Sequence, residues 1–404
     1  MGRDYSESLK KHKYFMEKSC SHAGEKTDKV KVLFFISSLE GGGAERVLVD
    51  ILRHIDRAKF APTLVLLYPY ENSPYREYLP ADIPVVVVGR QSDSFIEKIG
   101  QFLSFMQTVF KEDPQVILSK LTHNNLMAIL AGKLFNIKVI VCEHNTLSEV
   151  VRDRDGKYIL GVPVSPMVKI LYRSADRIVA ICEKIKENLI EDFHIPADKI
   201  SVIRNPLDMA RIEELGSIRP RHPFFDGLTH VVMAAGRMVP QKGFDILLKA
   251  FSQVVSEVEA RMIIMGEGPD METLKQTAQD LGIAGEVSFT GFQENPYQFM
   301  SHADVYVLSS RYEGMPMVVL ESMACGLPVI ATDCRSGIRE MLNDGECGML
   351  VPAEDPERLA GAIVRLIKDR PAREELSVLA KQRVGDFSAD KILKQYEDLI
   401  SSQL

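Results

Sequence analysis

Long apolar runs are missing from the 404-residue sequence. None reaches the roughly 18 residues that a bilayer-spanning helix needs, which excludes an integral membrane protein. The six cysteines contain no C-x-x-C pair, which excludes a disulfide scaffold and a zinc ribbon and suits a reducing cytoplasm. Residues 1–29 hold seven Lys or Arg and five Asp or Glu but no apolar segment of a secretory signal, so we expect a flexible tail there. A net positive charge is also lacking: the formal charge is −7, which argues against nucleic acid as the main partner.

Short apolar runs alternating with helical periods fill the rest of the chain. KVLFFISS (31–38) is typical of a strand buried on both faces, and the same alternation restarts at HVVMAAG (230–236). Between the two sets, residues 205–227 contain three prolines and no clear period, so we place the domain boundary there. The fold class predicted is α/β, with two doubly wound parallel-sheet domains that face a cleft.

The segment RYEGMPMVVLE (311–321) carries the strongest functional signal. Pro316 stands where a helix would begin, and the free amides of Met317, Val318 and Val319 would then point into the cleft. Together with the positive end of the helix dipole, such amides form an anion site.

Two glutamates flank this predicted helix start. Glu313 precedes it, beside Gly314 in the loop, and Glu321 lies four residues after Met317 on the same helix face. A carboxylate accepts two hydroxyl groups of a sugar or ribose, so each glutamate suits one end of a sugar nucleotide. The alternative is a solvated loop glutamate and a helix glutamate that caps neighbouring amides.

Two further turns follow strands of the second half. In GRMVPQKG (236–243), Arg237 and Lys242 are placed to converge on a diphosphate, although two solvated surface cations are the alternative. In MGEGPD (265–270), Gly266 and Gly268 would let the backbone approach a nucleotide, a weak signal by itself.

The first half contributes a glycine-rich turn and a histidine. LEGGGAER (39–46) brings backbone amides close to a phosphate or sugar, but the dinucleotide-binding pattern would need glycine at the position of Arg46, so a nicotinamide site fails. In CEHN (142–145), His144 follows a strand and would face the cleft, where it would bind a sugar hydroxyl or steady charge in a transition state. Its alternative role is to hold its own loop.

A metal site has little support. Asp153 and Asp155 form a D-x-D string, but they follow no buried strand and fit a solvated loop. Because Arg237, Lys242 and a helix terminus can neutralise a diphosphate, we expect no metal and no cofactor. No G-x-S-x-G turn supports a seryl enzyme.

The order of these motifs resembles that of the retaining glycosyltransferase family 4, which has the GT-B fold. The resemblance covers the chain from about residue 30 onward and rests on motifs that occur here in one order: GGGAER, CEHN, VIRNPLD, GRMVPQKG, GEGP and the pair Glu313 and Glu321 as E-x7-E. It implies an acceptor-side domain at 30–205, a nucleotide-sugar donor domain at 206–387 and a last helix within 388–404 that crosses back to the first domain.

The resemblance also implies a role for each matched residue. Glu313 would lie against the donor sugar, Glu321 would bind the ribose, Arg237 and Lys242 would hold the diphosphate, and His144 would sit beside the reacting sugar. The activity implied is retention of anomeric configuration during transfer from a nucleotide diphosphate sugar.

The remaining matched positions are implied donor contacts. Gly42 and Gly43 would close on the donor phosphates or the acceptor, and the amides near Met317 and Val318 would hold sugar and phosphate oxygens. Asn205 matches the family's hinge asparagine, although a proline follows it where glycine is frequent.

The branch with GGGAER and EHN resembles enzymes of bacterial surface or lipid-linked glycans that use UDP-hexoses or UDP-N-acetylhexosamines. Residues 1–205 hold 29 basic and 26 acidic side chains, a balance that suits a polyprenyl-linked acceptor at an anionic membrane surface. The apolar stripe of the helix predicted at 94–112 is expected to be core, and exposure of Phe105 would favour membrane contact instead. A nucleotide-sugar epimerase of the same architecture is the alternative function.

Overall fold

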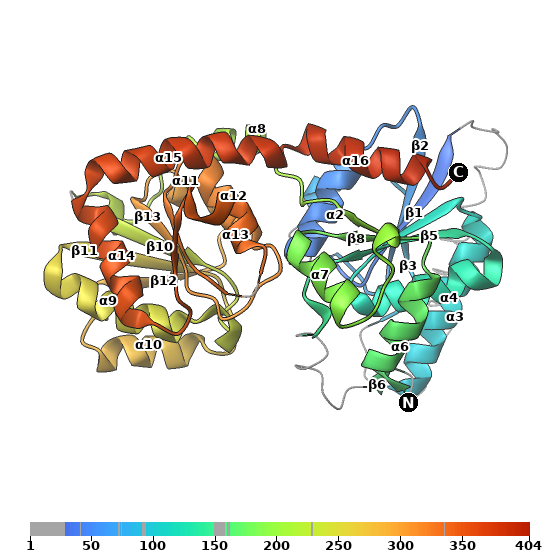
Figure 1. Cartoon of the computed structure of the whole chain (residues 1–404), viewed down its shortest axis with the longest axis horizontal. Coiled ribbons are helices and arrows are strands. Elements are labelled where there is room, and N and C mark those ends of the chain that lie inside the picture. Colours follow the sequence, from blue (N-terminus) through green and yellow to red (C-terminus); the bar gives the residue numbers. More distant parts are fainter. Residues whose placement is uncertain are drawn as a thin grey trace, which may run out of the picture.

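The computed structural model describes residues 29–404 except 41, 72, 74, 91–93, 149–157, 160–161, 228 and 335. The tail predicted at 1–29 therefore lies outside the described residues except for Lys29, and Asp153 and Asp155 lie outside them entirely. Figure 1 shows two α/β lobes side by side, with the long C-terminal helices running along one edge of both.

The first lobe contains a seven-stranded sheet whose strands are all parallel. Its spatial order is β3-β2-β1-β4-β5-β8-β9. The strands are β1 (Val30–Ile36), β2 (Phe60–Leu66), β3 (Val85–Val87), β4 (Val116–Lys120), β5 (Lys138–Glu143), β8 (Arg177–Ala180) and β9 (Ile200–Val202). The central strands are nearly continuous apolar runs because helices cover both faces of the sheet.

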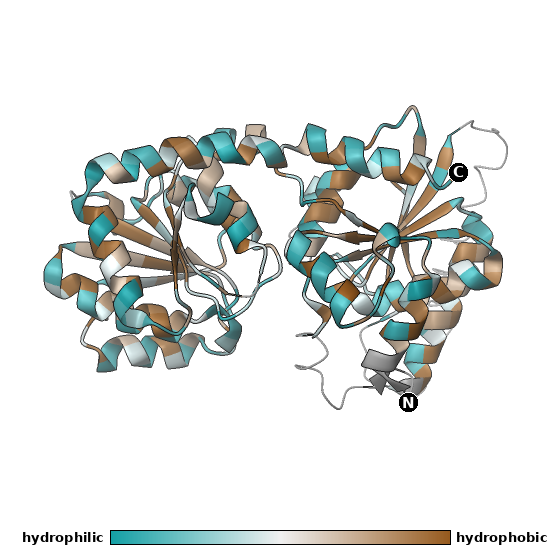
Figure 2. Ribbon diagram, in the orientation of Figure 1, coloured by the Kyte–Doolittle hydropathy of each residue, from teal (hydrophilic) through white to brown (hydrophobic). Residues whose placement is uncertain are grey.

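Helices cover this sheet, and Figure 2 shows hydrophilic and hydrophobic residues alternating along several of them. They are α2 (Gly43–His54), α3 (Phe95–Glu112), α4 (Thr122–Phe135), α6 (Val164–Leu171) and α7 (Glu183–Glu191). A short antiparallel pair, β6 (Tyr158–Ile159) and β7 (Val162–Pro163), precedes α6.

The second lobe repeats the same construction with a six-stranded parallel sheet in the order β12-β11-β10-β13-β14-β15. The strands are β10 (His230–Ala235), β11 (Ala260–Met265), β12 (Val287–Gly291), β13 (Val305–Leu308), β14 (Val329–Thr332) and β15 (Met349–Val351). The helices are α9 (Phe244–Glu257), α10 (Met271–Asp280), α11 (Tyr297–Met300), α12 (Met317–Ala324), α13 (Ile338–Met341), α14 (Pro356–Lys368) and α15 (Arg370–Val384). The predicted fold class, two doubly wound parallel-sheet domains, is confirmed.

The connection between the lobes contains a helix that the sequence reading missed. Helix α8 (Met209–Gly216) begins at Asp208, whose carboxylate accepts a hydrogen bond from the amide of Arg211. A helix of eight residues has too few turns to reveal its period, so only this N-cap signalled it. The last helix, α16 (Ala389–Ser401), returns to the first lobe, where Glu397 accepts a hydrogen bond from the amide of Asp56 at 2.9 Å.

The expectation that the apolar stripe of α3 is core was partly wrong. Phe105 is fully buried and stacks on Phe35 with ring centres 4.0 Å apart. In contrast, Ile96, Ile99 and Leu103 on the same helix are exposed. The helix has more apolar positions than one sheet face can cover, and the sequence period does not say which of them are turned outward.

Candidate active site

A partly buried ion pair lies where β10 and β13 end. The ammonium of Lys242 is 2.6 Å from Oε1 of Glu313, and the hydroxyl of Ser310 donates to the same oxygen at 2.7 Å. Gly243 makes this closeness possible: its φ of +63° favours glycine, and a Cβ there would lie 2.1 Å from the carbonyl of Ser309. Lys242 and Glu313 therefore compensate each other's charge, and the other two N–H groups of Lys242 remain available.

Arg237 lies in the turn after β10 and is exposed. Its side chain makes no hydrogen bond or ion pair with any residue that the structure describes. Gly266 and Gly268 support this turn, since a Cβ on either would lie 2.0 Å from the carbonyl of Gly236 or 2.3 Å from that of Met238. These glycines therefore allow the close packing of the backbone on both sides of Arg237.

The start of α12 offers unpaired backbone donors. Pro316 is its N-cap residue, and the amides of Met317 and Val318 have no hydrogen-bond partner in the described part of the chain. The expectation for Val319 was wrong, because its amide donates to the carbonyl of Pro316 at 3.0 Å and is not free. A tight turn at the proline consumes that donor, so two amides remain.

Glu321, one helical turn into α12, is bound by the other lobe. Nη1 of Arg46, from α2, lies 2.7 Å from Oε1 of Glu321, and Nη2 of Arg46 donates to the hydroxyl of Tyr297. Burial by itself lowers the pKa of Arg46, but the charges of Glu321, Tyr297 and Asp50 more than offset this, and the pKa is raised. The sequence reading treated Arg46 only as a mismatch to a dinucleotide motif; its position in the GGGAER turn was the available signal.

His144 follows β5 and rests on a buried lysine. Nε2 of His144 is 3.3 Å from the ammonium of Lys120, the last residue of β4 and a side chain with no exposed surface. Burial first, and then the charge of Lys120, hold the pKa of His144 well below its usual value. Because a charged ammonium can only donate, Nε2 accepts and the neutral ring carries its proton on Nδ1. Sequence reasoning missed Lys120, which stands in an otherwise ordinary strand.

The two lobes touch at several of the predicted positions. A Cβ on Gly314 would lie 2.0 Å from the carbonyl of His144, so only glycine permits this approach. A Cβ on Gly43, at the start of α2, would lie 3.9 Å from Cγ of Met317. Gly42 is the N-cap of α2, and its amide donates to the side chain of Glu45. The glycine-rich turn of the first lobe therefore faces the start of α12.

Asn205 is not joined to this group by any hydrogen bond or ion pair in the described residues. It lies buried in the connection between the lobes, and its Oδ1 has no hydrogen-bond partner there. Its neighbour Arg204 pairs with Glu340 of the second lobe at 2.5 Å.

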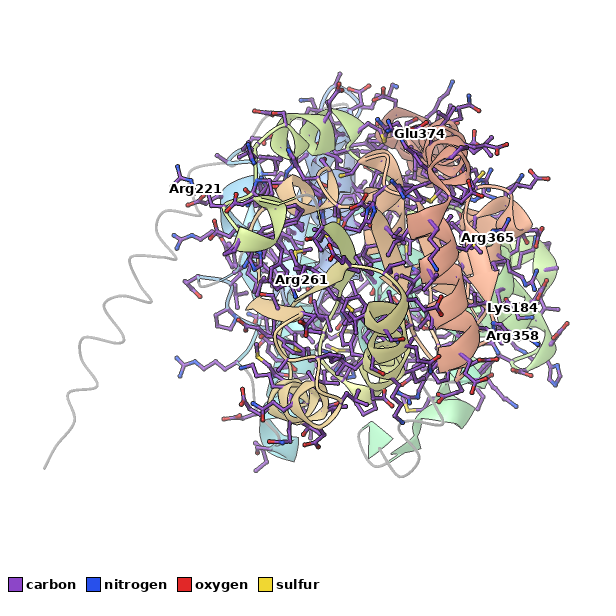
Figure 3. All side chains as sticks on the ribbon, turned by 90° about the vertical axis from the view of Figure 1, so that its left-hand side faces the viewer. Lys184, Arg221, Arg261, Arg358, Arg365 and Glu374 are labelled. Atoms are coloured by element: carbon purple, nitrogen blue, oxygen red, sulfur yellow. The ribbon has the colours of Figure 1, made fainter. Side chains whose placement is uncertain are left out.

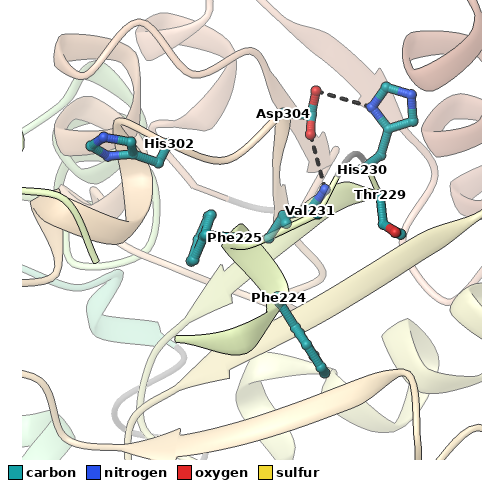
Figure 4. Close-up of a pocket in the computed structure, with 8 residues that line it drawn as sticks. Phe224, Phe225, Thr229, His230, Val231, His302 and Asp304 are labelled. Carbon is teal, nitrogen blue, oxygen red and sulfur yellow. Dashed lines mark hydrogen bonds and ion pairs between the residues drawn. The ribbon is translucent and has the colours of Figure 1, made fainter. Parts of the chain in front are cut away.

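Other polar groups lie away from the site. A cavity of about 220 Å³ opens at the amino end of β10, the opposite end from Arg237, and Asp304 there binds His230 at 3.1 Å and the amide of Val231 at 2.9 Å (Figure 4). Arg261 and Arg358 lie on the outer side of the second lobe (Figure 3).

The described residues contain no cluster of three or more His, Cys, Asp or Glu side chains that could hold a metal ion. Nor does this part of the chain include a helix that is long and apolar enough to cross a bilayer.

Comparison with known proteins identifies the class. Residues 41–211 match the family model described as Glycosyltransferase Family 4, and residues 229–369 match the model described as Glycosyl transferases group 1. The two lobes have the GT-B fold. The chain belongs to glycosyltransferase family 4.

Two relatives and one solved structure show the extent of the likeness. The chain is 26% identical, over 90% of its length and 97% of the relative, to the N-acetylgalactosamine-N,N'-diacetylbacillosaminyl-diphospho-undecaprenol 4-alpha-N-acetylgalactosaminyltransferase of Campylobacter jejuni. It is 23% identical, over 92% of its length and 99% of the relative, to the amylovoran biosynthesis glycosyltransferase AmsD of Erwinia amylovora. The Anabaena HepE structure in complex with UDP and glucose superposes with a TM-score of 0.76 at 22% identity, covering 92% of this chain and all of that one.

Proposed function

We propose that this glycosyltransferase moves a hexose or N-acetylhexosamine from a UDP-sugar to a hydroxyl of a glycan or polyprenyl-linked acceptor, with retention of configuration and without a metal. One observation carries the proposal: free donors lie in the turns that follow the adjacent strands β10 and β13. These are the exposed Arg237, the two remaining N–H groups of Lys242, and the amides of Met317 and Val318. Such a group is built for a diphosphate.

The donors act on the charge that develops in the reaction. As the bond between the sugar carbon and the phosphate oxygen breaks, negative charge grows on the diphosphate, where Arg237 and Lys242 stabilise it most. A bond forms from the acceptor oxygen to the same face of the sugar carbon, and the acceptor proton passes to the departing phosphate oxygen. No protein base is then needed on the opposite face.

The carboxylates and the histidine orient the donor. Glu313, fixed by Lys242 and Ser310, accepts hydroxyls of the sugar, and Glu321 accepts those of the ribose. The proton on Nδ1 of His144 is donated to a sugar hydroxyl, because Nε2 is already occupied by Lys120. The names of the relatives support this choice of substrates, since one acts on a diphospho-undecaprenol-linked sugar and another was solved with UDP and glucose.

A panel of UDP-sugars tests the donor, since a bound donor raises the melting temperature. NMR of the product then reports the anomeric configuration; an inverted linkage contradicts the mechanism.

Incubation of the donor without an acceptor tests the alternative function. The sugar of the donor should keep its stereochemistry, whereas formation of a new epimer would favour the epimerase.

An exposed apolar face supports contact with a membrane that carries the acceptor. Ile96, Ile99, Leu103 and Phe110 lie on one side of α3, and all four are exposed; we name them the α3 face. The spacing places them along one helix stripe, on the side away from the buried Phe105.

Neighbouring helices extend this face. Leu134 on α4 and Ile170 on α6 are also exposed, and the rings of Phe110 and Phe135 lie 5.9 Å apart. Exposed Lys111 and Lys133 flank them, which suits an anionic lipid surface. The face is thus equipped for peripheral binding at the inner side of a cell membrane.

Vesicle sedimentation tests this binding. We expect Leu103→Asp with Phe110→Asp to abolish association with anionic vesicles. Val378→Asp, at an equally exposed apolar position of α15, is the matched control and should leave association unchanged. Equal binding by the parent and the double variant would contradict the proposed surface.

A further inference from the structure

Arg46 links the two lobes at the carboxylate proposed for the ribose. Its guanidinium reaches from α2 to Glu321 on α12 and to Tyr297 on α11, and its carbon lies 5.5 Å from the centre of the Tyr297 ring. The side chains of Arg46 and Glu321 are only 17% and 5% exposed. The pair is therefore largely removed from solvent. A charge in such a place depends on its partner, because water does not solvate it.

The two oxygens of Glu321 are used unequally. Oε1 accepts from Nη1 of Arg46 at 2.7 Å and lies 3.4 Å from the hydroxyl of Tyr297. Oε2 has no hydrogen-bond partner in the described residues. A carboxylate can bind a guanidinium with one oxygen and a hydroxyl with the other, so Arg46 and a ribose need not compete.

We propose that Arg46 is a positioning residue that couples closure of the two lobes to donor binding, by holding one oxygen of Glu321 while the other accepts the ribose hydroxyls. The inference rests on the proposed function of Glu321 and adds to it a residue of the opposite lobe. When the lobes are apart, water solvates Glu321; when they meet, Arg46 is the one cation among the described residues that forms an ion pair with it. A lobe without Arg46 therefore closes over an unpaired buried carboxylate and binds the donor poorly.

A double-mutant cycle on donor kinetics tests the coupling. Loss of a hydrogen bond to a charged group weakens binding roughly 10- to 100-fold. We therefore expect Arg46→Ala to raise the donor KM by about that factor. Arg46→Lys should recover part of the loss, because one N–H still reaches Oε1. In a Glu321→Ala background, Arg46→Ala should raise the donor KM little further, because the partner of Arg46 is already absent.

Arg53→Ala is the matched control. Arg53 lies on the same helix and pairs with Asp208 at 3.5 Å, outside the site, so its removal should leave the donor KM unchanged. If the losses from Arg46→Ala and Glu321→Ala multiply in the double variant, Arg46 acts separately from Glu321, for instance on a phosphate, and the inference is overturned. An increase in KM by Arg53→Ala equal to that by Arg46→Ala would likewise reduce the effect to helix packing.

The outcome also separates this inference from the function on which it rests. If UDP and UDP-sugars leave the melting temperature of the parent unchanged, the proposed donor site fails. If they stabilise the parent and Arg46→Ala equally and Arg46→Ala has the donor KM of the parent, the donor site stands and the coupling by Arg46 fails.

Discussion

Replacing the buried Lys120 by methionine should stabilise the protein and at the same time reduce its activity. Lys120 is fully buried, and burial lowers the pKa of its ammonium from the usual 10.5 to about 8. A pKa change of this size corresponds to about 3 kcal/mol of cost for keeping the charge inside at neutral pH. Methionine has a similar length and carries no charge, so Lys120→Met removes that cost.

The stability of the parent protein should increase with pH above pH 8. Between pH 8 and 10.5 the unfolded chain binds the lysine proton and the folded chain does not, so the stability of the parent rises with pH in this window. The groups that face Lys120 are His144, Cys142 and the ring of Tyr396, 5.6 Å away. Burial raises the pKa of Cys142 to about 11, so this thiol stays protonated through most of the window.

Urea unfolding followed by circular dichroism measures the difference. The free energy of unfolding of Lys120→Met should exceed that of the parent by about 3 kcal/mol at pH 7 and by only about 1 kcal/mol at pH 9.5. Lys138→Met, an exposed lysine on the adjacent strand β5, is the control and should change stability little. Transfer should fall in Lys120→Met, because Nε2 of His144 loses its donor. A variant less stable than the parent at pH 7, or a difference independent of pH, would refute the reasoning.

Three further predictions concern the donor site. Arg237→Ala and Lys242→Ala should each lower kcat/KM at least tenfold, because the developing diphosphate charge loses a partner, while Lys249→Ala on the exposed side of α9 should not; parental turnover by both site variants would show that the phosphate site is misplaced. Excess EDTA should leave transfer undiminished, and inhibition that added metal reverses would contradict metal independence. By calorimetry, Glu321→Ala should weaken binding of free UDP more than Glu313→Ala does; the opposite order would exchange the two roles.

The order of motifs in the chain predicted which segments lie at the candidate site. Turns after buried strands must lie at the carboxyl edge of a parallel sheet, so GRMVPQKG, GEGP and the E-x7-E segment could be assigned to one edge before any coordinate was known. Period and turn chemistry are local properties, which is why Lys242 and Glu313 could be named as candidates from the sequence, whereas their mutual ion pair could not be foreseen. The pairing depends on Gly243 letting two loops approach, a distance that spacing does not encode.

The sequence by itself determined two α/β domains, their parallel sheets and the segments that end at the cleft, because strand and helix periods are written in neighbouring residues. Only the tertiary structure decided that Arg46 belongs to Glu321, 275 positions later, and that Lys120 lies beneath His144. It also decided which side of α3 is left exposed. Each of these depends on how separate elements pack, and burial, which sets the strength of a charge and the position of a pKa, exists only after they have packed.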